Sequence, residues 1–367
     1  HLIFIVKIKN NMKVCIIGSG LTGLTLAKAL VNQNIYVDFL VQKNGLKFSK
    51  SRTISISKNN IDYFNKNIIN IEKFLWKLKK IEIFTDNLRN ERLLKFENYN
   101  NQLFSIFKNY QLHEFLEKDL SKNKNFKKKL YKNNNLFFIN DYDLIINCDF
   151  SNIITKKYFS NKIIKKYNSF AYTTIINHEK ISNNIAMQFF TKNGPLAFLP
   201  ISDNETSIVY SVDNSIKKNL VELIENYNFK YKIKNIRKID SFELKLLILR
   251  SYHHNNILAF GDLLHRIHPL AGQGFNMTIR DIKIFSKLVD SKLDLGLPLD
   301  SSILKDFENN TKHLNYIFSS GINFIYEFFN MDNNFENQLS KKIIRRLGKN
   351  SLFNKMVTKF ADNGIIY

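Results

Sequence analysis

Two short clusters hold six of the chain's 12 glycines, where backbone groups could bind a ligand. Average usage would give roughly 26 glycines in a chain of this length. Lys, Asn, Ile and Phe are abundant instead, as a strong A/T codon bias would produce. Where glycine survives such a bias, a backbone requirement is the better explanation, because glycine adopts a positive φ without strain and lets a ligand approach the main chain.

The first cluster follows an apolar run at 12–17 and opens a helical pattern. In a strand–turn–helix of this spacing, the first glycine makes the tight turn, the second admits a pyrophosphate, and the third allows close helix–strand packing. The helix N-terminus also attracts phosphate charge. We therefore expect a dinucleotide here; a turn without a ligand is the alternative. The predicted contacts are Gly18, Ser19, Gly20, Leu21, Thr22 and Gly23.

The end of the second expected strand, YVDFLV at 36–41, lacks the usual acidic residue. In dinucleotide-binding turns that acid binds the ribose hydroxyls. Counted from Gly18, its position is Val41, with Gln42 beside it. Gln42 can supply a weaker hydrogen bond, so we assign both residues to the cofactor site.

The second cluster lies in FGDLLHRIHPLAGQGFN at 260–276. This segment resembles the second flavin-binding motif of the aromatic-hydroxylase flavoproteins. The resemblance implies that an Asp grips the ribityl chain of FAD, that a Pro lies against the isoalloxazine, and that a Gly-Gln-Gly turn aims N–H groups at the flavin C2 carbonyl. Such a turn at a helix N-terminus stabilises negative charge on reduced flavin. The implied contacts are Gly261, Asp262, Pro269, Gly272, Gln273, Gly274 and Asn276.

Two histidines stand in the same segment, His265 and His268. Their spacing could be mistaken for a pair of metal ligands, but no third ligand is nearby, so we expect no metal. His265 is a candidate to tune the flavin, with a structural role as the alternative. The sequence identifies no catalytic side chain.

The resemblance extends from Met12 onward. RTISIS at 52–57 is similar to the segment whose Arg approaches the cofactor, which implies a contact by Arg52. The segment 177–212 is similar to the substrate-domain sheet of the ubiquinone-biosynthesis hydroxylases of the UbiH/UbiF type. The family's Ala-Asp-Gly motif keeps its acid as Asp149, another implied cofactor contact. Phe150 stands where Gly is usual; Lys156 replaces Arg, and the two are not equivalent for phosphate.

The pattern of apolar runs predicts the architecture. The strand–helix–strand start predicts a parallel sheet. Strand-like runs dominate 168–250, and helical patterns follow from 275 to the end. Local patterns predict a helix at 61–80 with Trp76 as a packing residue, antiparallel strands at 80–86 and 92–98, a helix at 111–122, a loop or edge at 126–132 and a strand at 141–150.

With the resemblance, the fold class is α/β with an α+β insert. It comprises a Rossmann-like FAD-binding domain of the para-hydroxybenzoate-hydroxylase type, an interleaved β-sheet substrate domain and C-terminal helices. The FAD-binding domain is expected at 12–80, 111–165 and 250–320, the substrate domain at 81–110 and 166–249, and the helices at 321–367.

Composition limits the partners and the compartment. We attribute the net charge of +23 to lysines that codon bias has spread over a solvated surface, and not to a nucleic-acid partner. The lysines are scattered along the chain, and no sequence motif of a nucleic-acid-binding protein occurs. Cys15 and Cys148 lie in apolar strand-like runs, which favours a reducing compartment over disulfides or structural zinc. No run reaches transmembrane length. We expect a cytoplasmic protein, with peripheral contact at the inner face of the membrane as an alternative, and residues 1–11 as non-native or frayed.

The resemblance implies a function. NAD(P)H would reduce FAD, O2 would form a C4a-hydroperoxide, and the ring of a prenylated phenol of ubiquinone biosynthesis would be hydroxylated. One alternative is another flavoenzyme of this fold acting on a different aromatic or prenyl substrate. The other is a low-activity scaffold subunit of a quinone-biosynthesis complex. Residues 322–360 combine apolar and basic side chains, which suits either a membrane-docking helix pair or ordinary packing.

Overall fold

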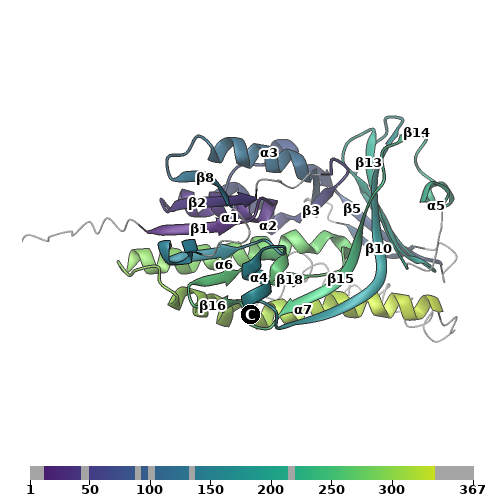
Figure 1. Ribbon diagram of the computed structural model, residues 1–367. Helices are drawn as coiled ribbons and strands as arrows, with labels where there is room; N and C mark the ends of the chain where they lie inside the picture. The colour runs from purple at the N-terminus through teal and green to yellow at the C-terminus, as the bar shows by residue number, and fades with distance from the viewer. Residues whose placement is uncertain are drawn as a thin grey trace, which may run out of the picture.

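The computed structural model describes residues 12–42, 49–86, 92–97, 104–131, 137–213 and 220–334. Two sheets lie side by side, and one long helix runs beneath both (Figure 1). The expectation for residues 1–11 lies outside the described residues. The expected mixed architecture is confirmed: a mostly parallel sheet with helices and a largely antiparallel second sheet.

The first sheet has six strands in the order β16-β17-β9-β1-β2-β8. β1 pairs in parallel with both β2 and β9, as the strand–helix–strand start predicts. β8 is an edge strand, in agreement with the expected loop or edge at 126–132. The strands are β16 (His253–His254), β17 (Ile257–Ala259), β9 (Leu144–Asn147), β1 (Lys13–Ile17), β2 (Tyr36–Gln42) and β8 (Phe126–Tyr131).

Helices cover this sheet with apolar faces. α1 (Leu21–Asn32) follows the first glycine cluster and contacts both α3 (Asn109–Leu120) and α6 (Gln273–Asp294). α3 is the helix expected at 111–122; it buries Leu112, Leu116 and Leu120 at helical spacing. Cys15 is buried in β1 and Cys148 follows β9, both as free thiols.

The second sheet has nine strands, and its pairings are antiparallel except where β5 meets β11. β5 pairs antiparallel with β6, as expected for 80–86 and 92–98. α5 (Leu220–Tyr227) buries an apolar stripe in the same core. The strands are β18 (His265–Arg266), β15 (Asp240–Leu249), β10 (Lys162–His178), β13 (Glu205–Asp213), β12 (Gly194–Pro200), β11 (Ile185–Thr191), β5 (Lys80–Thr85), β6 (Arg92–Glu97) and β14 (Ile233–Ile236).

The expected helix at 61–80 is wrong in its second half. α2 spans only Lys58–Asn67, and the chain then makes a 3-10 turn, η1 (Glu72–Phe74), into β4 (Trp76–Leu78). β4 forms a three-stranded sheet with β7 (Phe104–Lys108) and β3 (Thr53–Ser57). Pairing with β7 decides the structure here, because it satisfies the backbone that a helix would have satisfied locally. Trp76 is a packing residue, as predicted, and its Nε1 donates to the Asn183 carbonyl at 2.6 Å.

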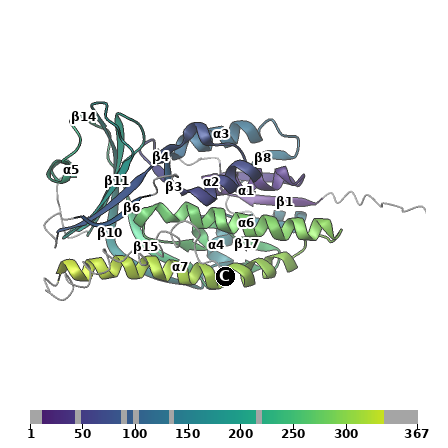
Figure 2. The ribbon, with the colours of Figure 1, turned by 180° about the vertical axis from the view of Figure 1, so that it is seen from behind.

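Two long helices close the described chain, as the helical pattern from 275 predicts. α6 and α7 (Ser302–Asn334) run side by side, and α7 continues beneath the second sheet (Figure 2). Phe318 and Ile322 are buried against that sheet, whereas Phe324 is 68% exposed. No helix among the described residues is long and apolar enough to cross a membrane.

The domain division stays a prediction, and two elements sit differently from its boundaries. β7, within the expected substrate segment 81–110, joins the small sheet with β3. β18, within the expected FAD segment 250–320, pairs with β15 of the second sheet. β7 and β18 are therefore each joined by backbone hydrogen bonds to a strand of the other predicted domain.

Candidate functional site

The first glycine cluster has the geometry predicted for a pyrophosphate turn. Gly18 has φ +125° and donates its N–H to the Leu40 carbonyl at 3.1 Å, which turns the chain sharply after β1. A Cβ on Gly23 would lie 2.7 Å from the Gly18 carbonyl oxygen, so α1 packs as closely as glycine permits. A Cβ on Gly20, the N-cap of α1, would meet nothing within 4 Å. The helix N-terminus therefore opens onto free space, where a phosphate could approach.

A histidine that sequence reasoning missed supports this turn. His113 of α3 is buried, and its Nε2 donates to the Ser19 carbonyl at 2.8 Å. The carbonyl can only accept, so this nitrogen carries the proton. The contact joins positions 94 residues apart, and in the sequence His113 is only one member of an amphipathic helix.

The second glycine cluster meets the first. η4 (Gly261–Leu263) lies against the start of α1, because a Cβ on Gly261 would lie 2.5 Å from Thr22 Cγ2. η5 (Leu270–Gly272) leads into α6 and lies against β3. Gly272 has φ +61°, and a Cβ there would lie 2.1 Å from Ser55 Oγ. A Cβ on Gly274 would meet nothing within 4 Å. Each cluster thus contributes one glycine that opens onto free space.

Asn276 fixes the second turn in place. Its Oδ1 accepts from the Ser57 backbone N–H at 2.9 Å and from Asn60 Nδ2 at 2.8 Å. Its Nδ2 donates to the Ser55 carbonyl at 3.1 Å. The predicted cofactor residue therefore spends its side chain on β3 and α2. Gln273 is buried beside it and Pro269 is partly exposed.

Two predicted acidic contacts lie near each other at the carboxyl end of β9. Burial first, and then the charges of Asp149 and Asp262, raise the pKa of the Cys148 thiol above its ordinary value. Asp262 is exposed, and among the described residues its carboxylate has no hydrogen-bond or ion-pair partner. It is therefore available to bind hydroxyl groups of a ligand.

The missing ribose acid has a substitute in space. Gln42 Nε2 donates to Asp149 Oδ2 at 2.9 Å, which brings a carboxylate to the end of β2 from the segment after β9. Tyr131, at the end of β8, lies with its hydroxyl 3.3 Å from the same nitrogen. Val41 is 5% exposed and packs in the core, so its side chain offers nothing to a ligand. Sequence spacing could not identify Tyr131, because β8 follows β2 by more than 80 residues.

Phe150 packs against the protein, whereas Arg52 is exposed to solvent. Phe150 packs against the core of the first sheet, with the Arg266 guanidinium 6.0 Å from its ring centroid. After it, Asn152 caps α4 (Ile153–Tyr158) by accepting from the Thr155 N–H. Arg52 is exposed, and its guanidinium has no hydrogen-bond or ion-pair partner in the part of the chain that the structure describes. It is available to an anion.

His265 faces the protein interior. Its Nε2 lies 2.6 Å from Asp281 Oδ2 of α6, and both side chains are buried. This geometry favours the structural alternative over flavin tuning. The described residues contain no group of three side chains able to hold a metal ion.

His268 is enclosed by aromatic rings. It stacks on Tyr326 with ring centroids 4.2 Å apart and meets the edge of Tyr167 at 5.5 Å. Burial lowers its pKa to about 3, so the imidazole is neutral at ordinary pH. Neither ring nitrogen has a hydrogen-bond partner among the described residues.

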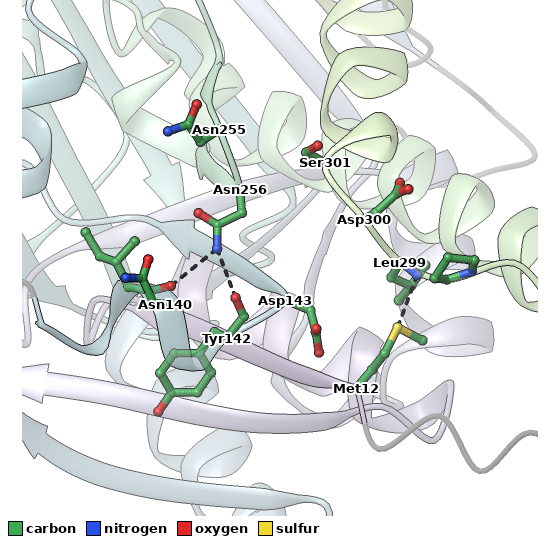
Figure 3. A pocket seen from close by; sticks show the side chains of 11 residues that line it. Met12, Asn140, Tyr142, Asp143, Asn255, Asn256, Leu299, Asp300 and Ser301 are labelled. Carbon is green, nitrogen blue, oxygen red and sulfur yellow. Dashed lines mark hydrogen bonds between the residues drawn. The ribbon is translucent and has the colours of Figure 1, made fainter.

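A separate pocket lies at the opposite end of the first sheet (Figure 3). It measures about 590 Å³ and is lined by Asn140, Asp143, Asn256 and Asp300, among others, near the amino ends of β1, β9 and β17. Asn256 Nδ2 donates to the Tyr142 carbonyl at 2.9 Å there. Ligands of open parallel sheets bind at the carboxyl ends of the strands, so this pocket is not the predicted cofactor site.

The residues at the carboxyl ends fit FAD. Gly20 and Gly274 open onto free space, the Asp262 carboxylate and the Arg52 guanidinium are exposed, and two helices begin at the two turns. A ligand with a pyrophosphate, polyol hydroxyls and a ring that carries negative charge matches this set.

Comparison with known proteins agrees with the geometry. Residues 146–290 match the family described as FAD binding domain. The chain is 26% identical over 153 residues to the ubiquinone hydroxylase UbiL of Rhodospirillum rubrum, covering 39% of this chain and 36% of that protein. It is 23% identical over 350 residues to the ubiquinone biosynthesis monooxygenase COQ6, mitochondrial, of Drosophila melanogaster, covering 74% and 73%.

A solved structure shares the whole fold. The p-nitrophenol 4-monooxygenase PnpA of Pseudomonas putida DLL-E4 superposes with a TM-score of 0.75 at 11% identity, covering 97% of this chain and 100% of that one. The chain spans little more than a third of the length of UbiL, but nearly three quarters of COQ6. The chain therefore contains a segment of the FAD binding domain family and is similar to hydroxylases and monooxygenases of ubiquinone biosynthesis.

Proposed function

We propose that this chain is a monooxygenase that uses FAD, NAD(P)H and O2 to hydroxylate the ring of a prenylated phenol in ubiquinone biosynthesis. The observation that carries the proposal is the junction of the two glycine clusters, in which Gly261 touches Thr22 and two further glycines face open space. The names of the relatives, ubiquinone hydroxylase and ubiquinone biosynthesis monooxygenase, support the substrate class. When bound, FAD supplies the chemistry that activates oxygen.

The proposed roles of the polar residues follow from their positions. The turn at 18–23 and the N-terminus of α1 bind the pyrophosphate, and the Asp262 carboxylate accepts hydrogen bonds from the ribityl hydroxyls. Gln42 and Asp149, held together at 2.9 Å, bind the adenosine ribose. The turn at 272–274 directs backbone N–H groups from the start of α6 toward the flavin ring, and Arg52 adds a positive charge from the segment before β3.

The apolar surroundings suit a hydrophobic substrate. A buried cluster joins the segment after β18 to the second sheet and α7, and its members include Ile267, Leu270, Met277, Phe190 and Phe318. These side chains exclude water next to the turn at 270–272, and an aromatic ring with a prenyl tail would be bound by such a wall. A neutral His268 beside this cluster adds no charge to it.

We also propose peripheral contact with a membrane, where a prenylated substrate would dissolve. Tyr316, Ile317 and Phe324 of α7 are 45–68% exposed. Ile322 and Phe318 face the protein core instead, so part of the expected apolar face is used for packing. The basic stretch KKIIRRLGKN lies outside the described residues. Membership of a quinone-biosynthesis complex remains a proposal of the same kind.

Product analysis tests the function. The chain is expressed in a host that accumulates a prenylated phenol because its own ring hydroxylase is deleted. We expect a product heavier by one oxygen, with the label incorporated from ¹⁸O2. Purified protein that holds FAD but yields no hydroxylated product in any such host would favour another substrate. Protein that holds no flavin would favour the scaffold alternative.

A further inference from the structure

A buried hydrogen-bonded chain links three segments around the second glycine cluster. His265 of β18 lies with its Nε2 2.6 Å from Asp281 Oδ2 of α6, and the two side chains are 0% and 2% exposed. Asp281 Oδ1 accepts from Asn315 Nδ2 of α7 at 3.0 Å. Both carboxylate oxygens are thus used, one by each neighbouring segment. We call His265, Asp281 and Asn315 the buried triad.

Fold stability is a weak explanation for such a group. Removing a carboxylate from water costs several kcal/mol, and replacing buried ion pairs by apolar residues is often neutral or stabilising. The surroundings would accept apolar side chains, since Leu264, Ile282 and Phe285 nearby in sequence are buried. What the polar triad adds is a defined geometry. Its hydrogen bonds depend on distance and angle, so they fix how β18, α6 and α7 lie relative to one another.

The positions of the triad connect it to the ring end of the proposed cofactor site. His265 follows Asp262 by three residues. Asp281 follows Gly274 by seven residues in α6, about two helical turns at 3.6 residues per turn. The 2.6 Å contact therefore joins the segment that carries Asp262, the proposed contact of the ribityl chain, to α6, whose N-terminal turn is proposed to face the flavin ring. Among the described residues, no hydrogen bond joins the triad to Gly18–Gly23 or to the Gln42–Asp149 pair, which build the adenosine end.

We propose that the buried triad sets the spacing between Asp262 and the turn at 272–274, and so determines affinity for the flavin half of FAD and not for its ADP half. His265, Asp281 and Asn315 are positioning residues, since they act through Asp262 and the turn. The inference rests on the proposed placement of FAD. A triad that serves only the fold would affect both halves of the ligand equally, and this difference makes the proposal testable.

The test compares FAD with ADP on the same full-length variants. FAD dissociation is measured by recovery of flavin fluorescence on dilution, and ADP binding by calorimetry on the protein freed of flavin. For Asp281→Asn we expect FAD affinity to fall at least tenfold while ADP affinity changes less than twofold. His265→Gln gives the same pattern, and the double variant loses less than the sum of the two, because each change breaks the same contact.

A matched control uses a second His–carboxylate pair, in which α7 supplies the carboxylate. His253 Nδ1 lies 2.9 Å from Glu308 Oε2, joining α7 to β16 away from the glycine clusters. Glu308→Gln should lower the melting temperature and leave the ratio of FAD to ADP affinity unchanged. Asn315→Ala, which keeps the His265–Asp281 contact, is the milder variant if Asp281→Asn does not fold; it should lower FAD affinity several-fold.

Two results would overturn the inference. If the triad variants lose FAD and ADP affinity in equal proportion, or retain both, the triad serves only the fold. If the wild-type chain binds ADP but no FAD, the proposed function is wrong and the inference falls with it. If only the inference about the triad is wrong, the wild-type chain still binds FAD normally. The two failures are therefore distinguishable.

Discussion

The two ends of the proposed FAD site are built in different ways. The adenosine end is mostly local: β1, the turn at 18–23, α1 and β2 follow one another within residues 13–42. The ring end combines β3, β18, the turn at 270–272, α6 and α7, which lie more than 200 residues apart in the chain at their extremes. The turn at 18–23 is held by its glycine backbone and by one distant side chain, His113, whereas the ring end depends on several side-chain contacts, such as those of Asn276 and the buried triad.

The ring end should respond more strongly to acid. The folded pKa of His268 is about 3, below its ordinary 6.5, so the unfolded chain binds a proton first as pH falls from 6.5 toward 3. Stability is therefore lost on the acid side and is unaffected above pH 6.5. At pH 4.5 the loss from this group is about 3 kcal/mol at 1.36 kcal/mol per pKa unit.

His268→Phe should remove that loss. Urea unfolding at pH 7.5 and 4.5 measures it, and the difference in unfolding free energy between the two pH values should shrink by about 3 kcal/mol in the variant. His254→Gln, a substitution at an exposed histidine, is the control variant, and its urea unfolding is measured at the same two pH values. An unchanged acid dependence in His268→Phe would contradict the assigned burial.

Asp262 tests the ring end directly. Because the carboxylate is exposed and unpaired among the described residues, Asp262→Ala should leave the flavin-free protein as stable as the wild type. A hydrogen bond to a charged acceptor contributes about 1.5–3 kcal/mol, so FAD affinity should fall about 10- to 150-fold. Undiminished flavin content after purification would rule out the proposed ribityl contact.

Two alanine substitutions separate fold from binding at the adenosine end. Gly23→Ala places a Cβ 2.7 Å from the Gly18 carbonyl oxygen, and overpacking of this kind costs about 1–3 kcal/mol of unfolding free energy. Gly20→Ala adds a methyl group where the protein leaves open space, at φ −80°. It should keep the melting temperature and weaken FAD at least tenfold. The reverse pattern, with Gly20→Ala unstable and Gly23→Ala unable to bind, would contradict the assigned roles.

Phe150 follows Asp149 of the adenosine end and lies near Arg266 of β18, and it tests the route of NAD(P)H. We expect NAD(P)H oxidation by the wild type to be slow and Phe150→Gly to raise it several-fold, because a large ring stands where the family has glycine. Stopped-flow reduction of bound flavin measures the rate. Equal rates in both proteins would mean that the loop accommodates the ring without obstructing the nucleotide.

The smallest expected effect concerns the membrane. Vesicles with anionic lipid should carry the full-length chain upward in flotation at low salt, because each basic residue near such a surface contributes about 1 kcal/mol, and high salt should release it. Phe324→Asp should weaken flotation, whereas Leu295→Asp, an equally exposed change at the end of α6, should not. A wild-type chain that stays in solution with both neutral and anionic vesicles would show that the C-terminal helices serve only packing.

The sequence by itself determined the local parts of this protein. Six residues after a strand were enough to predict the first turn, because glycine positions specify a positive φ and close packing without reference to distant segments. The motif at 260–276 and the run of strands at 168–250 likewise predicted the fold class, which the relatives confirm. The predicted helix over 61–80 failed where pairing with β7 outweighed local preference.

Only the tertiary structure decided which side chains the site can use. It brought Asp149 to Gln42 where the acid of β2 is missing, placed His113 beneath Ser19, turned Asn276 toward β3, and buried His265 against Asp281. Each of these contacts joins residues 16 to 219 positions apart. A pattern of residue types carries no such information, because a hydrogen bond depends on distances and angles between atoms that only the folded chain defines.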